Sequence, residues 1–375
     1  MPECVFEFIP FLFDGGAESL VRNYSIALKN QGIEPIIIVL NDKGNTATKR
    51  ILCENRIKVI SLYRKWSVVA RMNHKLFGSF HIEKKLKRLI KTFNPVAIHA
   101  HLSTLKDLKR CSSIISINNI NLFYTCHSLP ERYFGGKNKG QRVVAKRLVN
   151  SANLRFIALH NQMKNEIDKL FNVNNTVVMS NGIDLNYYRH IPDSKATIRK
   201  ELGIPEGSFV IGHIGRFIDV KNHVFLVNVF DLLHTQDPNA FLVLVGKGEL
   251  RETIETQVNE RGLSASVKIF EDRIDVNRIL KSMDVFVFPS KYEGLPLSLV
   301  EAQAAGLKCV ISDSINTEAV LSEKCLSLSL NDPITTWVDV IRDDKVRVET
   351  YDKIEKFDIN AIVLDLIGLY RGKKS

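Results

Sequence analysis

The stretch DVFVFPSKYEGLPLSLVEAQAAGLKCVISD, which runs from Asp284 to Asp313, decides the fold class of this chain. It contains an apolar strand at Val285 to Phe288, a polar loop with a glycine, a helix that carries Glu301, and a second apolar strand at Lys308 to Ser312. Strand, helix and strand in this order form a βαβ unit. Ligands of open parallel sheets bind at the carboxyl ends of the strands, so the loop after the first strand is predicted to line a binding site.

Two glutamates bracket that loop. Glu293 precedes the helix, and Glu301 lies about one turn into it. A helix N-terminus offers free backbone N–H groups and a partial positive charge, which suits a phosphate. Carboxylates repel phosphate but accept hydrogen bonds from sugar or ribose hydroxyls. The combination predicts a ligand that has both parts, such as a nucleotide sugar.

Two domains are the natural expectation for 375 residues, because a single hydrophobic core rarely grows that large. Runs such as Pro35 to Leu40 are too apolar for a sheet with one buried face and indicate parallel strands. The alternation of strands and helices continues to Thr176–Met179 and starts again at Phe209, after a stretch rich in His, Pro, Asp and Ser. The sequence therefore predicts an α/β protein with a domain boundary near residue 185.

Positive charge belongs to the first half of the chain. Residues 1 to 187 hold 28 lysines and arginines against 13 acidic residues, and the remainder holds 24 against 28. The basic residues cluster between Arg64 and Arg110 and between Lys137 and Arg147. Nucleic acid, an anionic membrane surface or a phosphorylated substrate would each fit this charge, and solvated helix faces are the alternative for any single lysine.

Several protein classes are disfavoured. The six cysteines show neither CxxC nor metal-ligand spacing, so we expect reduced thiols in a cytosolic protein. Neither half carries GxGxxG after its first strand, which argues against an NAD-dependent dehydrogenase. No run reaches the roughly 20 apolar residues that cross a bilayer. The apolar start, interrupted by Glu7 and Pro10, predicts a strand over residues 4–13 instead of a signal peptide.

Candidate site residues follow the strands of both halves. Gly15 and Gly16 stand between the first strand and a helix, where glycine lets the backbone approach a ligand closely. His101 and His127 each follow a strand and are candidates for substrate contact, although a ring that is satisfied by a neighbouring carbonyl is the alternative. Neither has the close Cys or Asp partners of a metal site.

In the second half of the chain, two cationic residues follow the first strand, as Gly15 and Gly16 do in the first half. Arg216 stands at the end of its first strand, and Lys221 is expected to open the next helix. An arginine fork and a lysine point charge would flank a diphosphate, with surface ion pairing as the alternative.

The chain resembles glycosyltransferase family 4. Five blocks stand in the order seen in that family: GGAES (15–19), SNGID (180–184), GRFIDVKN (215–222), LVLVGKGE (242–249) and DVFVFPSKYEGLPLSLVEAQAAG (284–306). The last block, with seven residues between its two glutamates, is the most specific. The resemblance implies a GT-B fold, in which two Rossmann-like domains with parallel sheets face each other across a cleft. Residues 1–185 would form the acceptor-side domain and 186–356 the donor domain, with a final helix at about 357–375 packing back on the first.

The resemblance also implies roles for individual residues. Arg216 and Lys221 would hold the donor diphosphate and stabilise the leaving group, with no required metal or other cofactor. Glu301 would bind the ribose, Glu293 the sugar ring, and His127 the donor sugar. Gly15 and Gly16 would close over the diphosphate from the other domain. Backbone N–H groups near the helix start would fix sugar and phosphate; they belong to Gly294, Leu295, Pro296, Leu297 and Ser298, of which proline contributes no N–H.

Two positions depart from the family pattern. Val220 stands where an acid or amide often precedes the lysine, and this matters little if only the lysine must reach phosphate. His160 stands where a serine often follows the strand.

The expected activity is a retaining transfer of a hexose or N-acetylhexosamine from a nucleotide sugar, such as a UDP-sugar, to a saccharide. The implied acceptor is a lipid-linked oligosaccharide of surface polysaccharide synthesis. The basic first domain then suits an anionic membrane better than nucleic acid, for which no motif is present. We expect a cytoplasmic protein that is peripheral at the inner face of the cell membrane. A nucleotide-sugar 2-epimerase of the same fold and a non-catalytic partner subunit are the alternatives.

Overall fold

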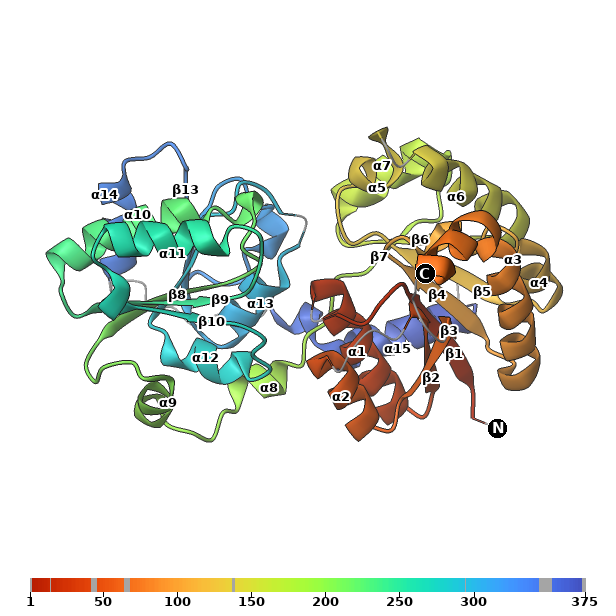
Figure 1. Cartoon of the computed structure of the whole chain (residues 1–375), viewed down its shortest axis with the longest axis horizontal. Helices are drawn as coiled ribbons and strands as arrows, with labels where there is room; N and C mark the ends of the chain where they lie inside the picture. The colour runs from red at the N-terminus through yellow and green to blue at the C-terminus, as the bar shows by residue number, and fades with distance from the viewer. Residues whose placement is uncertain are drawn as a thin grey trace. The chain divides into compact units, whose positions relative to one another are not determined.

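The computed structural model describes residues 2–13, 15–41, 46–63, 68–136, 139–293, 295–343 and 353–372, with the backbone alone at 68–71, 73–75 and 77–79. The chain divides into two compact units (Figure 1). The first consists of Met1–Ile183 together with Asp358–Ser375, and the second of Asp184–Phe357. The sequence places the boundary near residue 185, and the change of unit falls between Ile183 and Asp184.

The first unit is built on a parallel sheet of seven strands in the order β3-β2-β1-β4-β5-β6-β7. The order reverses between β1 and β4, which are hydrogen-bonded neighbours, and such a switch point is where open α/β sheets bind ligands. The strands are β1 (Cys4–Ile9), β2 (Glu34–Asn41), β3 (Lys58–Tyr63), β4 (Ala97–His101), β5 (Asn121–Thr125), β6 (Arg155–Ala158) and β7 (Val177–Val178).

Helices complete the first unit. The last helix of the chain, α15 (Ile359–Tyr370), packs against α1 (Gly16–Asn30), and both share a core with β1, β4 and β5. Leu366 and Val363 are fully buried there, which explains the apolar character of this segment. The other helices are α2 (Ala47–Glu54), α3 (Val68–Phe93), α4 (Ser112–Ile117), α5 (Pro130–Phe134), α6 (Lys139–Ala152) and α7 (Asn161–Phe171).

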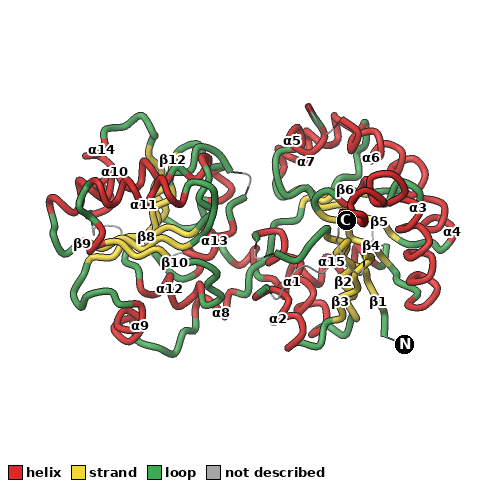
Figure 2. The backbone as a smooth tube through the Cα atoms, in the orientation of Figure 1, coloured by secondary structure: helices red, strands yellow, loops and turns green. Residues whose placement is uncertain are grey.

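The second unit repeats this plan with a six-stranded sheet in the order β10-β9-β8-β11-β12-β13, whose switch point lies between β8 and β11. Its strands are β8 (Phe209–Ile214), β9 (Ala240–Val245), β10 (Val267–Phe270), β11 (Val285–Phe288), β12 (Lys308–Ser312) and β13 (Cys325–Leu328). The helices α10 (His223–Gln236), α11 (Arg251–Glu260) and α14 (Ile334–Arg342) cover one face, around the buried Trp337 (Figure 2). The remaining helices are α8 (Leu185–Arg189), α9 (Lys195–Leu202), α12 (Val276–Ser282) and α13 (Leu297–Ala304).

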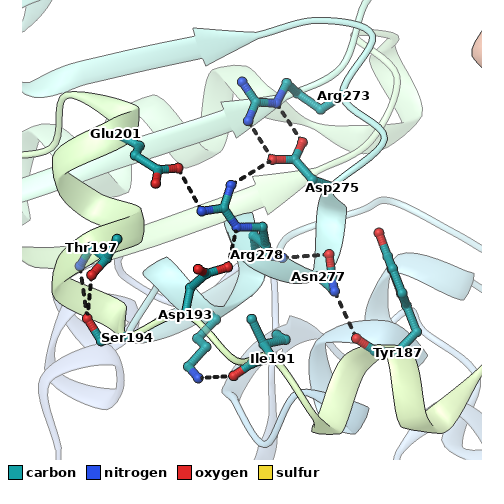
Figure 3. A network of polar contacts seen from close by, with 11 residues as sticks. Tyr187, Ile191, Asp193, Ser194, Thr197, Glu201, Arg273, Asp275, Asn277 and Arg278 are labelled. Atoms are coloured by element: carbon teal, nitrogen blue, oxygen red, sulfur yellow. Dashed lines mark hydrogen bonds and ion pairs between the residues drawn. The ribbon is translucent and has the colours of Figure 1, made fainter.

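A polar network ties the start of the second unit to α12 (Figure 3). Arg278, on α12, donates from Nε to Asp193 (2.9 Å) and from Nη2 to Glu201 (2.6 Å). It thereby links α12 both to α9 and to the segment that precedes α9. Asn277 donates from Nδ2 to the carbonyl of Tyr187 at 2.9 Å. These contacts place residues 184–202 within the second unit.

Some expected elements differ in extent. The first strand ends at Ile9 and not at residue 13, since Pro10 has no N–H to donate to a neighbouring strand. α3 spans 26 residues and begins well before its most regular apolar stripe at Ile82, Leu86 and Ile90. Within the described residues, no helix has the length and apolar character needed to cross a membrane.

Candidate functional site

The structure joins two of the predicted site residues directly. Lys221 Nζ lies 2.8 Å from Glu293 Oε1, and the two side chains are only 14% and 17% exposed. Lys221 follows β8 and Glu293 follows β11, so the pair sits at the switch point of the second sheet. The ammonium also lies over the ring of Phe288, 4.6 Å from its centre. An ion pair held at this position can take up an anionic ligand through the lysine and hydroxyls through the glutamate.

Backbone contacts fix the two loops that carry this pair. The N–H of Lys291 donates to the carbonyl of Val220 at 2.8 Å, and Lys291 Nζ pairs with Asp219 at 2.6 Å on the surface. The expectation that Lys221 opens a helix is wrong. Lys221 ends a 3₁₀ turn (Asp219–Lys221), and Asn222 takes a left-handed conformation (φ 56°) before α10 begins. Asn is among the few residues that adopt this conformation readily, and the turn directs Lys221 to Glu293.

Arg216 is held in place by a neighbouring loop. Its own side chain is exposed, and no hydrogen bond or ion pair of the guanidinium occurs within the described ranges. The N–H of Phe217 donates to the carbonyl of Lys247 (3.0 Å), and the loop that includes Gly246 and Gly248 lies flat against residues 215–217. A Cβ on Gly246 would lie 2.0 Å from the carbonyl oxygen of Gly215. The Gly-Lys-Gly sequence therefore serves to bring two backbones together.

The predicted donor-binding helix is α13. Its N-cap is Pro296, and no side chain caps the helix, so the N–H groups of Leu297 and Ser298 stand at its free end. Leu295 is buried, and Gly294 lies outside the described residues. Glu301 is half-buried one turn further along the helix. The carboxylate of Glu301 and the N–H groups of Leu297 and Ser298 thus lie within two turns of the same helix, and their contact with a donor stays a prediction.

The side chain of Gln303 anchors α13 to the segment that follows β12. This buried side chain donates from Nε2 to the carbonyls of Leu299 (3.2 Å) and Ala319 (2.8 Å). Its Oε1 accepts from the N–H groups of Leu321 (2.8 Å) and Ser322 (3.2 Å). All four hydrogen-bonding positions of the amide are used, which locks the helix against the segment after β12.

Two buried histidines lie close to Lys221, and the sequence alone did not indicate them as site residues. His213 on β8 and His223 at the start of α10 are both buried, with ring centres 4.7 Å apart. His213 Nδ1–H donates to the carbonyl of Val287 (2.9 Å), while its Nε2 and both nitrogens of His223 have no hydrogen-bond partner in the described part of the chain. Burial, aided by the charge of Lys221, lowers the pKa of His223 to about 3. The only sequence signal was two histidines flanking a predicted phosphate loop.

The first unit presents its own candidates at its own switch point. Gly15 is the N-cap of α1, and Gly16 is the first helical residue; apart from its chain neighbours and the helix backbone, no described atom lies within 4 Å of where its Cβ would be. His127 follows β5 and is half-buried. Its Nε2 lies 3.0 Å from His101 Nδ1, so the two candidate histidines are hydrogen-bonded to each other. Burial keeps the pKa of His127 well below its usual range, and His101 acts in the same direction.

His160 has a local role. Its Nδ1 accepts from the N–H of Met163 (3.2 Å) and caps α7, which is the work a serine does at such a position. This departure from the family pattern therefore preserves the cap.

Comparison with known proteins identifies the family. The model "Glycosyltransferase Family 4" matches residues 14–187, and the model "Glycosyl transferases group 1" matches residues 194–324. EpsF of Bacillus subtilis, named as a glycosyltransferase, is 32% identical over 273 residues, which cover 69% of this chain and 68% of EpsF. The chain belongs to the family 4 glycosyltransferases.

This family 4 glycosyltransferase is also similar to an Escherichia coli enzyme named UDP-Gal:alpha-D-GlcNAc-diphosphoundecaprenol alpha-1,3-galactosyltransferase (28% identity, 70% of each chain). Among solved structures, HepE of Anabaena in complex with UDP and glucose superposes with a TM-score of 0.76 at 18% identity, over 99% of this chain and 100% of HepE. The predicted family, transferase class and GT-B fold are confirmed. The structure brings Lys221 and Glu293 together in the second unit, with Arg216 on the same loop as Lys221, and places His127, Gly15 and Gly16 in the first unit.

Proposed function

We propose that this glycosyltransferase moves a hexose or N-acetylhexosamine from a UDP-sugar to a lipid-linked saccharide, with retention of the anomeric configuration. The observation that carries the proposal is the Lys221–Glu293 pair (2.8 Å) at the switch point of the second sheet, with the exposed Arg216 on the same loop as the lysine. Two cations beside a carboxylate suit a ligand with a diphosphate and a sugar.

The proposed chemistry needs no metal and no other cofactor. The bond between the anomeric carbon and the β-phosphate oxygen breaks, and its electron pair leaves with UDP. An acceptor oxygen bonds the same face of the sugar, and its proton passes to the departing phosphate. Arg216 and Lys221 stabilise the negative charge that grows on this phosphate, while Glu293 orients the lysine and accepts from a sugar hydroxyl. Glu301 binds the ribose, and His127, Gly15 and Gly16 stay predictions for donor contact.

The names of similar proteins support the donor and the acceptor. The Escherichia coli relative is named for a UDP-sugar donor and a diphosphoundecaprenol-linked acceptor, and HepE structures are described in complex with UDP and with UDP-glucose. CapH of Staphylococcus aureus, 26% identical over 78% of this chain, is named for capsular polysaccharide biosynthesis. These names favour a role in building a surface polysaccharide.

The donor is tested by incubating the protein with UDP-, GDP- and ADP-sugars and following slow release of the nucleotide. We expect the wild-type protein to hydrolyse a UDP-sugar. Arg216→Ala and Glu293→Ala should each lower kcat at least 100-fold, the order of magnitude of a lost transition-state contact. Lys247→Ala should keep a normal kcat. Lys247 is a matched control, since it pairs with Asp272 on the surface of the neighbouring loop. Release of a free epimer, or variants within a few-fold of wild type, would refute the proposal. An inverted anomer in the glycoside product would refute retention.

An exposed apolar surface on α3 fits a lipid-linked acceptor. Met72, Leu76 and Phe80 are 60%, 68% and 51% exposed, and their spacing of four residues puts them on one side of the helix. The same side continues to the exposed Lys84, and the guanidinium of Arg110 stacks 3.5 Å from the centre of the Phe80 ring. Apolar side chains next to cations suit an anionic bilayer surface, so we propose peripheral attachment at the inner face of the cell membrane.

Vesicle flotation tests this attachment. The wild-type chain should float with vesicles of phosphatidylglycerol and phosphatidylcholine and stay behind with phosphatidylcholine alone. The triple variant Met72→Gln, Leu76→Gln, Phe80→Gln should lose flotation. Leu364→Gln is the control, because Leu364 is a similarly exposed (56%) leucine on α15 of the same unit. Equal flotation with both vesicle types, or of both variants, would exclude this surface.

A further inference from the structure

A series of hydrogen bonds, of which those to Glu7 are buried, runs from α15 through β1 and β4 to His127. Tyr370 Oη donates to Glu7 Oε1 (2.8 Å), and Glu7 Oε2 lies 2.8 Å from His101 Nε2. His101 Nδ1 in turn lies 3.0 Å from His127 Nε2. Glu7, His101 and Tyr370 are at most 1% exposed, so water does not compete for the two bonds of Glu7, whereas the bond to the half-buried His127 is only partly shielded.

The carboxylate of Glu7 sets the direction of the hydrogen bonds between Tyr370 and His127. A carboxylate has acceptors only, so His101 must donate to Glu7 from Nε2–H. The Nδ1 of a neutral His101 then carries the lone pair and accepts from His127 Nε2–H. His127 is left with Nδ1 as its one ring acceptor. Since the ring of His127 is kept neutral by its burial, it exists as one tautomer or the other.

We propose that Glu7 is a positioning residue that fixes His127 in the Nε2–H tautomer through His101. The inference rests on the proposed function only in assuming that His127 contacts the donor sugar. In this tautomer His127 Nδ1 can accept from a sugar hydroxyl, and in the other it can only donate.

A second branch anchors the same carboxylate without setting the tautomer. His99 Nδ1–H donates to Tyr370 Oη (2.7 Å), and Thr125 Oγ1–H donates to His99 Nε2 (2.7 Å). Tyr370 therefore holds Glu7 in place, while the charge of Glu7 directs His101. The two functions are separable by mutation.

The cluster of Glu7, His99 and His101 also has the composition of a metal site, since its candidate ligand atoms lie within 4.8 Å of one another. Each of the four ring nitrogens of His99 and His101 already has a hydrogen-bond partner, as do both oxygens of Glu7. The geometry favours the hydrogen-bonded network over a bound ion.

The substitution Glu7→Gln gives a sharp test. The amide keeps the shape of the carboxylate and can still accept from Tyr370, but its NH₂ group now donates to His101 Nε2. His101 must then donate from Nδ1–H to His127 Nε2, and both rings change tautomer. The ¹⁵N NMR spectrum of histidine-labelled protein distinguishes Nε2–H from Nδ1–H directly. We expect His127 as Nε2–H in the wild type and as Nδ1–H in Glu7→Gln.

Two control variants separate this effect from loss of structure. Glu3→Gln removes a carboxylate that pairs with Arg371 (2.6 Å) and so links the same two elements at the surface; it should leave His127 unchanged. Tyr370→Phe should also leave the tautomer unchanged, because the glutamate remains. A wild-type His127 with Nδ1–H would overturn the proposal even if Glu7→Gln failed to fold. Stoichiometric zinc in the purified wild type that is lost in Glu7→Gln would overturn it as well.

Activity adds an independent readout. With the tautomer inverted, we expect kcat of donor hydrolysis to fall about 10- to 100-fold, the effect of one misdirected hydrogen bond, with a smaller change in KM. A changed tautomer with an unchanged kcat would support the Glu7 relay and would count against the contact of His127 with the donor. An unchanged tautomer would refute the relay whatever the activity.

Discussion

Lys221 and Glu293 form an ion pair across the switch point of the second sheet, while Arg216, five residues before the lysine, extends into solvent. The two cations therefore differ in what they do for the folded chain. Lys221 is part of a half-buried pair, whereas Arg216 is held through its backbone and its side chain has no hydrogen bond or ion pair among the residues that the structure describes.

Substitution of the two cations should separate activity from stability. Arg216→Ala and Lys221→Ala should each lower kcat by about 100- to 1000-fold, because each removes a charge from the leaving group. Only Lys221→Ala should lower the free energy of unfolding, by about 1 to 3 kcal/mol, since it leaves the Glu293 carboxylate half-buried without its cation. Donor hydrolysis and urea denaturation measure the two effects. Equal destabilisation by both variants would contradict the distinction.

Gly246→Ala should disturb the loop that carries Arg216. The new Cβ would clash with the carbonyl of Gly215, and we expect kcat to fall at least 10-fold along with a stability loss of about 1 to 3 kcal/mol. Gly262→Ala is the control: Gly262 also has a positive φ (69°) but has open space around its Cβ position. It should lose stability to backbone strain and keep its kcat. A normal kcat in Gly246→Ala would show that the loop contact does not position Arg216.

The buried His213–His223 pair should make the second unit sensitive to acid. The pKa of His223 is about 3 in the folded chain, because of burial and the nearby Lys221, against about 6.5 for an unfolded histidine. Above pH 6.5 neither state binds the proton, so stability is full. As the pH falls below 6.5 only the unfolded state takes up the proton, and stability declines by about 1.4 kcal/mol per pH unit until the pH approaches 3.

Urea denaturation between pH 7 and pH 4.5 measures this slope. In a Trp66→Phe background the remaining tryptophan is the buried Trp337, which reports on the second unit. His223→Phe should reduce the slope, whereas replacing the exposed His190 by Gln should leave it unchanged. Identical slopes in wild type and His223→Phe would contradict the assignment.

His160 should be replaceable by serine. His160→Ser keeps an acceptor for the N–H of Met163, while His160→Ala removes it and should destabilise α7 by about 1 kcal/mol. Hydrogen exchange of the amides in Asn161–Phe171 measures the local effect. Faster exchange in the serine variant than in the alanine variant would argue against a capping role.

The sequence predicts the strands of the second sheet well. β11 and β12 have the predicted bounds, because buried parallel strands are short apolar runs between polar turns. The start of α10 was misplaced at Lys221, since the left-handed conformation of Asn222 depends on a single backbone torsion that leaves little trace in composition. In α3 the buried stripe at Ile82, Leu86 and Ile90 is joined by an exposed apolar stripe at Met72, Leu76 and Phe80, and spacing alone does not distinguish an exposed stripe from a buried one.

Sequence reasoning selected candidate residues for the site, but it did not predict the contacts between them. Spacing and strand position selected Lys221, Glu293 and His127, but nothing in the sequence indicates that the first two pair with each other. The hydrogen bond between Tyr370 and Glu7 joins positions 363 residues apart, and only the folded sheet brings them together. Buried polar partners of this kind have no periodicity that a sequence pattern can reveal.

The first unit is discontinuous, because α15 completes a core whose other elements lie before residue 184. During translation β1 leaves the ribosome early, yet Glu7 meets Tyr370 only after the whole second unit has been synthesised. Until then Glu7 lacks that partner, and the apolar side chains that α15 covers are open to solvent. Completion of the first unit therefore waits for the synthesis of α15, and a nascent chain stalled within the second unit should present this face to chaperones.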